Sequence, residues 1–367
     1  MDTSSYKPGL EGVIAGISAV SMVDAEKNEL LYRGYDIHDL VEHCTMDEVA
    51  YLLLYGELPD AATLAAFNQR IRMDREVPPA LYDLLRALPN TAHPMDRLKA
   101  AVALLATFLP EDEPNLRKAE RLYAKLPTLV CASWRISQGQ EPIAPDPNLD
   151  HSASFFHLLT GTPRTDYLAH VFNVTQILYA EHGFNASTFA ARVTVSTLSD
   201  LYSGVVSAIG TLKGPLHGGA NEAAMEMLQE IGSPENAQEW VRDALVQKKK
   251  IMGFGHREYK HGDERAKIVK GYAKELAERT GNTLWWEISE LVEAEMLAAK
   301  KLHPNLDFPV ASVYYLMELP IPVYTPIFVL SRITGWSAHI IEQLENNRII
   351  RPGHLYNGLE KRSLAPR

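Results

Sequence analysis

The N-terminal part of the chain alternates apolar and polar residues on both sides of a short polar stretch. Residues 17–37, ISAVSMVDAEKNELLYRGYDI, place DAEKN between two such runs. A period of two is typical of strands that bury one face, and a short polar link between two runs is typical of a turn. The pattern predicts a small β-hairpin.

Beyond this hairpin the pattern changes to the 3.6-residue spacing of amphipathic helices. Residues 46–60, MDEVAYLLLYGELPD, begin with an acidic pair, continue with an apolar stripe and end at Gly and Pro. The same spacing predicts helices within residues 60–76, 93–110, 165–183, 221–232, 237–250 and 326–347. Dividing the chain by the mean length of a helix and its loop gives about fifteen helices. We therefore predict an all-α protein with one short β-hairpin.

Charged residues are concentrated in one part of the chain. Residues 219–316 contain KKK, HREYKHGDERAK and KELAERT, whereas both flanks read as apolar helical hairpins. We expect a small helical domain at 219–316, inserted into a large domain built from residues 1–218 and 317–367. A cleft between two domains is a common place for a ligand site.

Composition narrows the class of protein. Of the 367 residues, 46% are hydrophobic, which is enough for a substantial core. The net charge of −10 argues against nucleic acid or an anionic membrane as partner, because both need clustered cations. Cys44 and Cys131 show no metal-ligand spacing, so we expect no metal site and favour free thiols over a disulfide. No secretory signal is visible and the most apolar run, residues 100–109, is too short to span a bilayer, so a cytoplasmic protein is expected.

Candidate chemistry begins at KGPLHGGANEAAMEML, residues 213–228, where His217 stands between Gly-Pro and Gly-Gly steps. A helix beginning near Gly219 or Ala220 would present unpaired N–H groups and a partial positive charge, which disfavours a cationic imidazole. A neutral His217 could then donate a hydrogen bond to a developing oxyanion, as a histidine does in triosephosphate isomerase. The glycines would let a ligand approach the backbone. A tight turn capped by His217 explains the same residues equally well.

A basic, glycine-containing segment follows. KKKIMGFGHREYKHGDERAK, residues 248–267, joins three lysines, Gly-Phe-Gly and His256, with Arg265 in the next predicted helix. A Gly-x-Gly loop beside lysines suits a phosphate-bearing ligand, although the spacing fits neither a P-loop nor a dinucleotide fingerprint. A solvated basic loop is the alternative.

Asp307 lies among apolar residues in HPNLDFPVASVYYL, residues 303–316. Partial desolvation would raise the pKa of its carboxyl group and make it a stronger base. Asp307 could equally cap a helix that starts at Pro309. The sequence does not separate these two interpretations.

Three further residues are candidate ligands or structural groups. Arg332 and Arg351 flank the last predicted amphipathic helix, and two guanidinium groups could clamp carboxylates, although most arginines form surface salt bridges. His182, in YAEHGFNAST, lies at a helix break, where a lone histidine is usually structural.

Together, GPLHGGANE, IMGFGHREY, PNLDF and GWSAHIIEQ, in this order, closely resemble the citrate synthase family, from YRGYDI to RPGHLYNG. The resemblance implies the two-domain, all-α citrate synthase fold. It also implies an acyltransferase that condenses acetyl-CoA with oxaloacetate and hydrolyses the citryl thioester, with no permanently bound cofactor. Asp307 would be the general base, His217 would bind the thioester oxygen, and His256 would polarise the ketone of oxaloacetate.

The resemblance also assigns binding residues. The dicarboxylate would be held by His182, Arg265, Arg332 and Arg351, the last supplied by the second subunit of a homodimer, and less securely by Arg72 in NQRIRMDRE. Coenzyme A would lie along Lys249, Lys250, Ile251, Met252, Gly253 and Phe254, with Lys260 on phosphate. An acidic protein can bind two anions in this way because its cations converge at the site.

A few positions depart from the family pattern. Glu258 stands where the family often has an aliphatic residue, Glu264 where it often has proline, and Glu318 where glycine is frequent. NLDFP followed by YYLM looks more like the 2-methylcitrate synthases, which accept propionyl-CoA. One methylene discriminates by only about 1–3 kcal/mol, so dual activity is compatible with the sequence. Citrate formation is the main expectation, 2-methylcitrate formation is the alternative, and a non-catalytic assembly or regulatory homologue is a third hypothesis.

Overall fold

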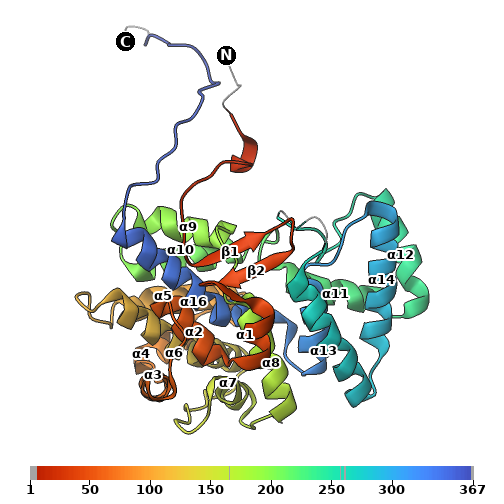
Figure 1. Ribbon diagram of the computed structural model, residues 1–367, viewed down its shortest axis with the longest axis horizontal. Helices are drawn as coiled ribbons and strands as arrows, with labels where there is room; N and C mark the ends of the chain where they lie inside the picture. The colour runs from red at the N-terminus through yellow and green to blue at the C-terminus, as the bar shows by residue number, and fades with distance from the viewer. Residues whose placement is uncertain (1–5, 165, 257, 260–261, 365–367) are drawn as a thin grey trace.

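The computed structural model describes residues 6–164, 166–256, 258–259 and 262–364. Within these ranges the chain forms sixteen α-helices, two short 3-10 helices and three strands (Figure 1). The strands and the first ten helices are β1 (Ser21–Asp24), β2 (Glu29–Tyr32), β3 (Tyr35–Asp36), α1 (Ile37–His43), α2 (Met46–Tyr55), α3 (Ala61–Met73), α4 (Pro79–Ala87), α5 (Pro94–Ala106), α6 (Asn115–Ser137), α7 (His151–Thr160), α8 (Asp166–Tyr179), α9 (Ala186–Val195) and α10 (Leu201–Leu212). The remaining elements are α11 (Ala220–Ile231), α12 (Pro234–Val246), α13 (Glu264–Thr280), α14 (Leu284–Lys300), α15 (Asp307–Leu316) and α16 (Tyr324–Glu345), with 3-10 helices η1 (Pro8–Leu10) and η2 (Ile321–Val323).

The predicted hairpin is confirmed and is extended by a third strand. β1 pairs antiparallel with β2, with Ser21 opposite Tyr32, and β2 pairs antiparallel with β3. Leu30 and Tyr32 are buried, as the alternation requires. Asn28 closes the turn with φ 60°, a left-handed conformation that asparagine tolerates better than most residues.

The predicted helices are present, and local sequence explains where they begin. Thr45 and Glu48 form a reciprocal capping box at the start of α2, and Gly56 ends that helix with φ 94°. Asp60 caps α3. These caps satisfy N–H groups that would otherwise lack partners, typically contributing about 1 kcal/mol each.

The long helix α16 forms the centre of the larger group of helices. It contacts α2, α5, α6, α8, α9 and α10, and its residues are buried from Tyr324 to Ile340. Gly335 lies directly against Glu181 and the carbonyl of Ala180, where an added Cβ would overlap both. Close approach of α16 to the segment after α8 therefore requires glycine at this position.

Helices α11 to α15 pack largely against one another. The main contacts join α13 to α15, α12 to α14, and α11 to α15, and Figure 1 shows α11 to α14 gathered on one side of the molecule. The segments before β1 and after α16 both leave the helical body toward the top of the view in Figure 1. Both cysteines in the described ranges, Cys44 and Cys131, are free thiols. No helix of the described residues is long and apolar enough to cross a membrane.

Candidate active site

His217 lies in a tight turn between α10 and α11. Its N–H donates to the carbonyl of Gly214 at 2.9 Å, and the N–H of Gly218 donates to the carbonyl of Leu212 at 2.9 Å. A Cβ on Gly218 would overlap the side chain and carbonyl of Leu212. α11 begins at Ala220, as predicted. The expected turn is thus present, and packing against Leu212 requires glycine at 218 whether or not a ligand approaches there.

Hydrogen bonds fix the orientation of the imidazole of His217. Its Nε2 accepts the backbone N–H of Ser187 at 3.3 Å and lies 2.8 Å from the Ser187 hydroxyl, which also accepts from Trp336 Nε1 at 3.0 Å. The same hydroxyl donates to Asn185 Oδ1 at 2.8 Å, so Ser187 ties the ring of His217 to the start of α9. Burial, followed by the charge of Arg332, lowers the pKa of His217 to about 3. The expected lowering is confirmed, with burial rather than the helix terminus as its main cause.

His256 is also held as a neutral donor. Its Nδ1 accepts the N–H of Glu258 at 3.1 Å and that of Tyr259 at 3.4 Å, which leaves the proton on Nε2. Burial and then the charge of Arg265 lower the pKa of His256 to about 4. The ring centroid lies 4.9 Å from that of His182.

Backbone pairing joins the His256 loop to the segment that leads into α15. The N–H of Gly255 donates to the carbonyl of His303, and the N–H of Asn305 donates to the carbonyl of Gly253, both at 2.9 Å. Gly253 and Gly255 have φ of 80° and 79°, and a Cβ on Gly253 would overlap Phe308. The Gly-x-Gly pattern therefore serves the backbone geometry that holds this loop against α15.

Asp307 is the first residue of α15. The helix begins two positions before Pro309, and the N–H of Asp307 is bound by the side chain of Asn305 at 3.1 Å. The interpretation of Asp307 as the cap of a helix starting at Pro309 is therefore wrong. The carboxylate instead accepts the hydroxyl of Tyr179 at 2.7 Å on Oδ1. Burial raises the pKa of Asp307 to about 6, even though the Tyr179 hydrogen bond and Arg265 lower it. The expected rise is confirmed.

Asp263 connects Arg265 to the turn before α15. Its carboxylate accepts Arg265 Nε at 3.0 Å and Nη2 at 2.8 Å, and also the N–H of Leu306 at 3.3 Å. Burial acts to lower the pKa of Arg265, but the Asp263 carboxylate raises it above its ordinary value. Asp263 was not among the residues predicted from the sequence. Its position directly before a predicted helix was the available signal, since Asp is a preferred N-cap.

Arg332 is a buried cation whose terminal nitrogens lack an acid. Its Nε donates to the carbonyl of Tyr179 at 2.6 Å, and its guanidinium carbon lies 4.8 Å from the centroid of the Phe328 ring. Among the described residues, no carboxylate forms an ion pair with it, and burial lowers its pKa to about 10. The carboxylates of Glu181 and Asp307 act against this lowering but do not overcome it. Burial of the charge is therefore costly, and the site favours an anionic ligand.

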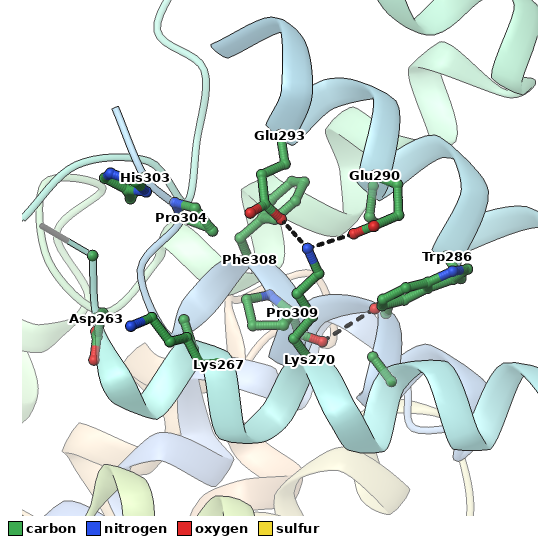
Figure 2. A pocket seen from close by; sticks show the side chains of 15 residues that line it. Asp263, Lys267, Lys270, Trp286, Glu290, Glu293, His303, Pro304, Phe308 and Pro309 are labelled. Carbon is green, nitrogen blue, oxygen red and sulfur yellow. Dashed lines mark hydrogen bonds and ion pairs between the residues drawn. The ribbon is translucent and has the colours of Figure 1, made fainter. Parts of the chain in front are cut away.

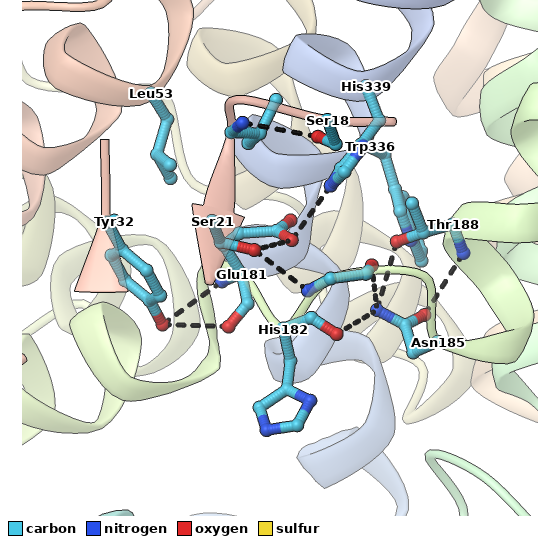
Figure 3. A network of polar contacts seen from close by, with 12 residues as sticks. Ser18, Ser21, Tyr32, Leu53, Glu181, His182, Asn185, Thr188, Trp336 and His339 are labelled. Carbon is cyan, nitrogen blue, oxygen red and sulfur yellow. Dashed lines mark hydrogen bonds and ion pairs between the residues drawn. The ribbon is translucent and has the colours of Figure 1, made fainter. Parts of the chain in front are cut away.

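A polar network fixes the segment that carries His182 (Figure 3). Glu181 lies between Ser21 Oγ and His339 Nε2, each 2.9 Å from its Oε1, and the Tyr32 hydroxyl donates to the Glu181 carbonyl at 2.9 Å. His182 Nε2 lies 3.1 Å from the Tyr259 hydroxyl. Burial, then Arg265, hold the pKa of His182 well below its ordinary value. The hairpin and α16 together therefore position a neutral imidazole.

The remaining residues predicted to bind coenzyme A or the dicarboxylate lie in several parts of the fold. Lys249 is bound to Glu230 at 2.9 Å and lies over the Trp240 ring. Lys250 is exposed, Ile251 is buried, Met252 is half-buried and Lys260 is outside the described residues. Arg72 lies on α3, which packs against α2 and α6, so the structure does not bring it to the histidines. Arg351 is exposed and lies in the segment that follows α16.

A pocket lies behind the turn before α15, between α13, α14 and residues 303–312 (Figure 2). Lys270 in this pocket is paired with Glu290 at 2.6 Å and Glu293 at 2.8 Å, while Phe308 and Pro309 form part of its apolar lining. The ion pairs join α13 to α14 and leave Lys270 without a free charge for an anion. The residues around this pocket thus hold the turn before α15 in place. They add no free cation to the group of histidines and arginines.

The fold and the site define an all-α enzyme with a poised carboxylate, neutral histidine donors and arginines suited to a dicarboxylate. Residues 9–353 match the family model described as citrate synthase, C-terminal domain. The chain belongs to the citrate synthase family and is an acyltransferase of that family.

Relatives and solved structures agree across the chain. The chain is 47% identical over 361 residues to 2-methylcitrate synthase of Mycobacterium tuberculosis H37Rv, covering 98% of this chain and 92% of the relative. It is 47% identical to a citrate synthase of Mycolicibacterium smegmatis, covering 97% and 96%. A ternary complex of carboxymethyl coenzyme A and oxaloacetate with citrate synthase from Thermoplasma acidophilum matches with a TM-score of 0.93 at 34% identity, covering 98% of each chain.

Proposed function

We propose that the protein condenses an acyl-CoA with oxaloacetate, with acetyl-CoA as substrate and citrate as product. The observation that carries this proposal is the pairing of Asp307, whose pKa of about 6 suits a general base, with imidazoles kept neutral by burial. A base works best when its pKa is near the operating pH. The bound substrates of the Thermoplasma acidophilum relative, carboxymethyl coenzyme A and oxaloacetate, support the same pair of ligands.

The first step is removal of a proton from the α-carbon of the thioester by Asp307. Negative charge then develops on the thioester oxygen, and the neutral ring of His217 stabilises it by an N–H hydrogen bond while the substrate proton rests on Asp307. A neutral donor placed before the reaction stabilises this charge without reorganisation. The enolate carbon attacks the ketone carbon of oxaloacetate, and the Nε2–H of His256 hydrogen-bonds to the ketone oxygen as it becomes an alkoxide, which then takes a proton from water. Water then cleaves the citryl thioester and releases coenzyme A.

The dicarboxylate is held by Arg265, Arg332 and His182, and Arg351 comes from the second subunit of a homodimer. Support for this set is the buried guanidinium of Arg332, which lacks a bound acid among the described residues, and the nearness of Arg265 to His182 and His256. Coenzyme A lies along residues 249–254, with Lys260 on phosphate. Arg351 is exposed in the chain-terminal segment, where a second subunit could receive it.

We also propose that residues 219–316 form a small domain that closes on a large domain of residues 1–218 and 317–367. The mutual packing of α11 to α15 supports this division. Arg265, His256 and Asp307 belong to the small domain, whereas His182 and Arg332 belong to the large one. The two sets already meet, since the rings of His182 and His256 lie 4.9 Å apart and Tyr179 binds Asp307. Opening of the domains would admit the substrates, and closure would exclude water while the enolate exists.

The choice of acyl group is the point on which the relatives differ. Relatives at 47% identity are named both 2-methylcitrate synthase and citrate synthase, and the Asp307-Phe308-Pro309 sequence favours propionyl-CoA as a second substrate. Thiol release should be measured with acetyl-CoA and with propionyl-CoA at saturating oxaloacetate. A higher kcat/KM for acetyl-CoA supports citrate formation, and the reverse ratio supports 2-methylcitrate formation. A folded protein that binds coenzyme A but turns over neither thioester would contradict the proposal.

A further inference from the structure

Tyr179 contacts both the proposed base and the proposed substrate arginine. It is the last residue of α8 and is only 1% exposed. Its hydroxyl donates to Oδ1 of Asp307 at 2.7 Å, and its carbonyl accepts Nε of Arg332 at 2.6 Å. Its ring centroid lies 4.1 Å from that of Phe328, so packing fixes the direction of the hydroxyl.

We propose that Tyr179 is a positioning residue that occupies Oδ1 of Asp307, so that Oδ2 is the oxygen that removes the proton from the acyl-CoA. This inference rests on the proposed function. Among the hydrogen bonds of the described residues, the side chain of Asp307 is bound through Oδ1, by Tyr179, and no bond to Oδ2 is found. A carboxylate held through one oxygen keeps the other aimed at a fixed point, and small displacements of a reacting group are costly in rate.

The Tyr179 hydroxyl remains a donor throughout the working pH range. Burial, followed by the charge of Asp307, raises the pKa of Tyr179 well above its ordinary value, so the phenol stays protonated. The residue therefore cannot compete with Asp307 for the substrate proton. It acts through the carboxylate that it holds.

The groups around Asp307 allow its ionisation to be identified in a pH–rate profile. The charged and titratable groups that interact with it are Tyr179 from α8, Asp263 and Arg265 at the start of α13, Arg332 from α16, and Tyr314 from its own helix. The hydroxyl donor and the two arginines favour the carboxylate, and Asp263 opposes it. Burial lowers the pKa of His217 to about 3 and that of His256 to about 4. We therefore assign an acidic limb near pH 6 to Asp307.

The test is Tyr179→Phe, which keeps the ring and its packing against Phe328. We expect kcat to fall about 10- to 100-fold and the acidic limb of kcat/KM for the acyl-CoA to move up by about one pH unit, because the carboxylate loses a hydrogen bond that favours its charged form. KM for oxaloacetate should not change, since the bond from Arg332 goes to the backbone. An unmoved limb would overturn the proposal.

Tyr314→Phe is the matched control. Tyr314 is a buried tyrosine on α15 whose hydroxyl lies 3.1 Å from Thr175 Oγ1, with no hydrogen bond to Asp307 among the described contacts. Tyr314→Phe also removes a buried hydroxyl where α15 packs against α8. It should leave the acidic limb of kcat/KM in place. An equal shift in both variants would mean a general packing effect and would also overturn the proposal.

A readout without turnover separates this inference from the proposed function. Carboxyl-¹³C aspartate labelling, with Asp307→Asn to assign the signal, gives the titration of Asp307 directly. If neither thioester is turned over, the proposed function fails, yet a higher Asp307 midpoint in Tyr179→Phe still shows that the hydroxyl tunes this carboxylate. An unchanged midpoint in the variant would reject the role of Tyr179 even in an active enzyme.

Discussion

The side-chain amide of Asn28 donates to Oε1 of Glu264 at 2.5 Å. This bond fastens the turn of the N-terminal hairpin to the first residue of α13, beside Arg265. At the other end of the hairpin, Ser21 holds Glu181 and the N–H of Gly183. The hairpin therefore connects the segment that carries His182 to the helix that carries Arg265.

Asn28→Ala should loosen this connection. The lost bond is part-buried and is worth about 1 kcal/mol, so KM for oxaloacetate should rise about fivefold with little change in kcat. Steady-state kinetics with varied oxaloacetate measure this. Lys27→Ala, at the neighbouring turn position, is the control, and Glu264→Gln keeps an oxygen that can accept from Asn28 and should stay near wild type. An unchanged KM in Asn28→Ala would remove the hairpin from the binding of the dicarboxylate.

Asp307→Asn should separate catalysis from stability. General bases contribute about 10²- to 10⁴-fold, so kcat should fall by that order while Tyr179 can still donate to the amide oxygen. Because the folded-state pKa is raised from 3.8 to about 6, ionisation of Asp307 destabilises the wild type as pH rises from about 4 to 6. The penalty then stays constant at higher pH and is at most ~3 kcal/mol.

The variant lacks this penalty. Denaturant unfolding at pH 8 should therefore show Asp307→Asn to be at least as stable as wild type, and the two proteins should converge near pH 4. If Asp307→Asn is less stable than wild type at pH 8, burial does not destabilise the ionised carboxylate of Asp307. A variant with near wild-type kcat would end its assignment as the base.

The parts of the molecule that local pattern controls were predictable. The hairpin and the helix starts follow from alternation, from apolar spacing and from caps such as Thr45 and Asp60. The start of α15 was not predictable. Asn305 and the distant Asp263 bind the backbone N–H groups of Asp307 and Leu306, and these bonds override the preference for proline at the first helical position. Tyr179 meets Asp307 across 128 positions of sequence, and no local pattern can indicate such a contact.

Arg332→Gln should impair substrate binding without unfolding the protein. A hydrogen bond to a charged group is worth about 1.5–3 kcal/mol, so KM for oxaloacetate should rise about 10- to 150-fold. Glutamine can still donate to the Tyr179 carbonyl. In thermal melts, oxaloacetate should raise the Tm of the wild type but not of the variant. Arg72→Ala, on the remote helix α3, should retain the wild-type KM. Equal effects in both variants would mean that Arg332 has no special role.

Arg351 offers a test of the shared site. It is exposed in its own chain, so Arg351→Ala should leave the melting temperature of the subunit nearly unchanged while raising KM for oxaloacetate. If each site takes Arg351 from the partner, co-refolding equal amounts of Arg351→Ala and Asp307→Asn should restore about a quarter of the wild-type activity at low oxaloacetate, because half of the dimers are mixed and each carries one intact site. Activity no greater than the mean of the two separate variants would place Arg351 outside the partner's site. Size-exclusion chromatography with light scattering on the same samples establishes whether the mixed species are dimers, so that an absent dimer and an absent Arg351 contribution are told apart.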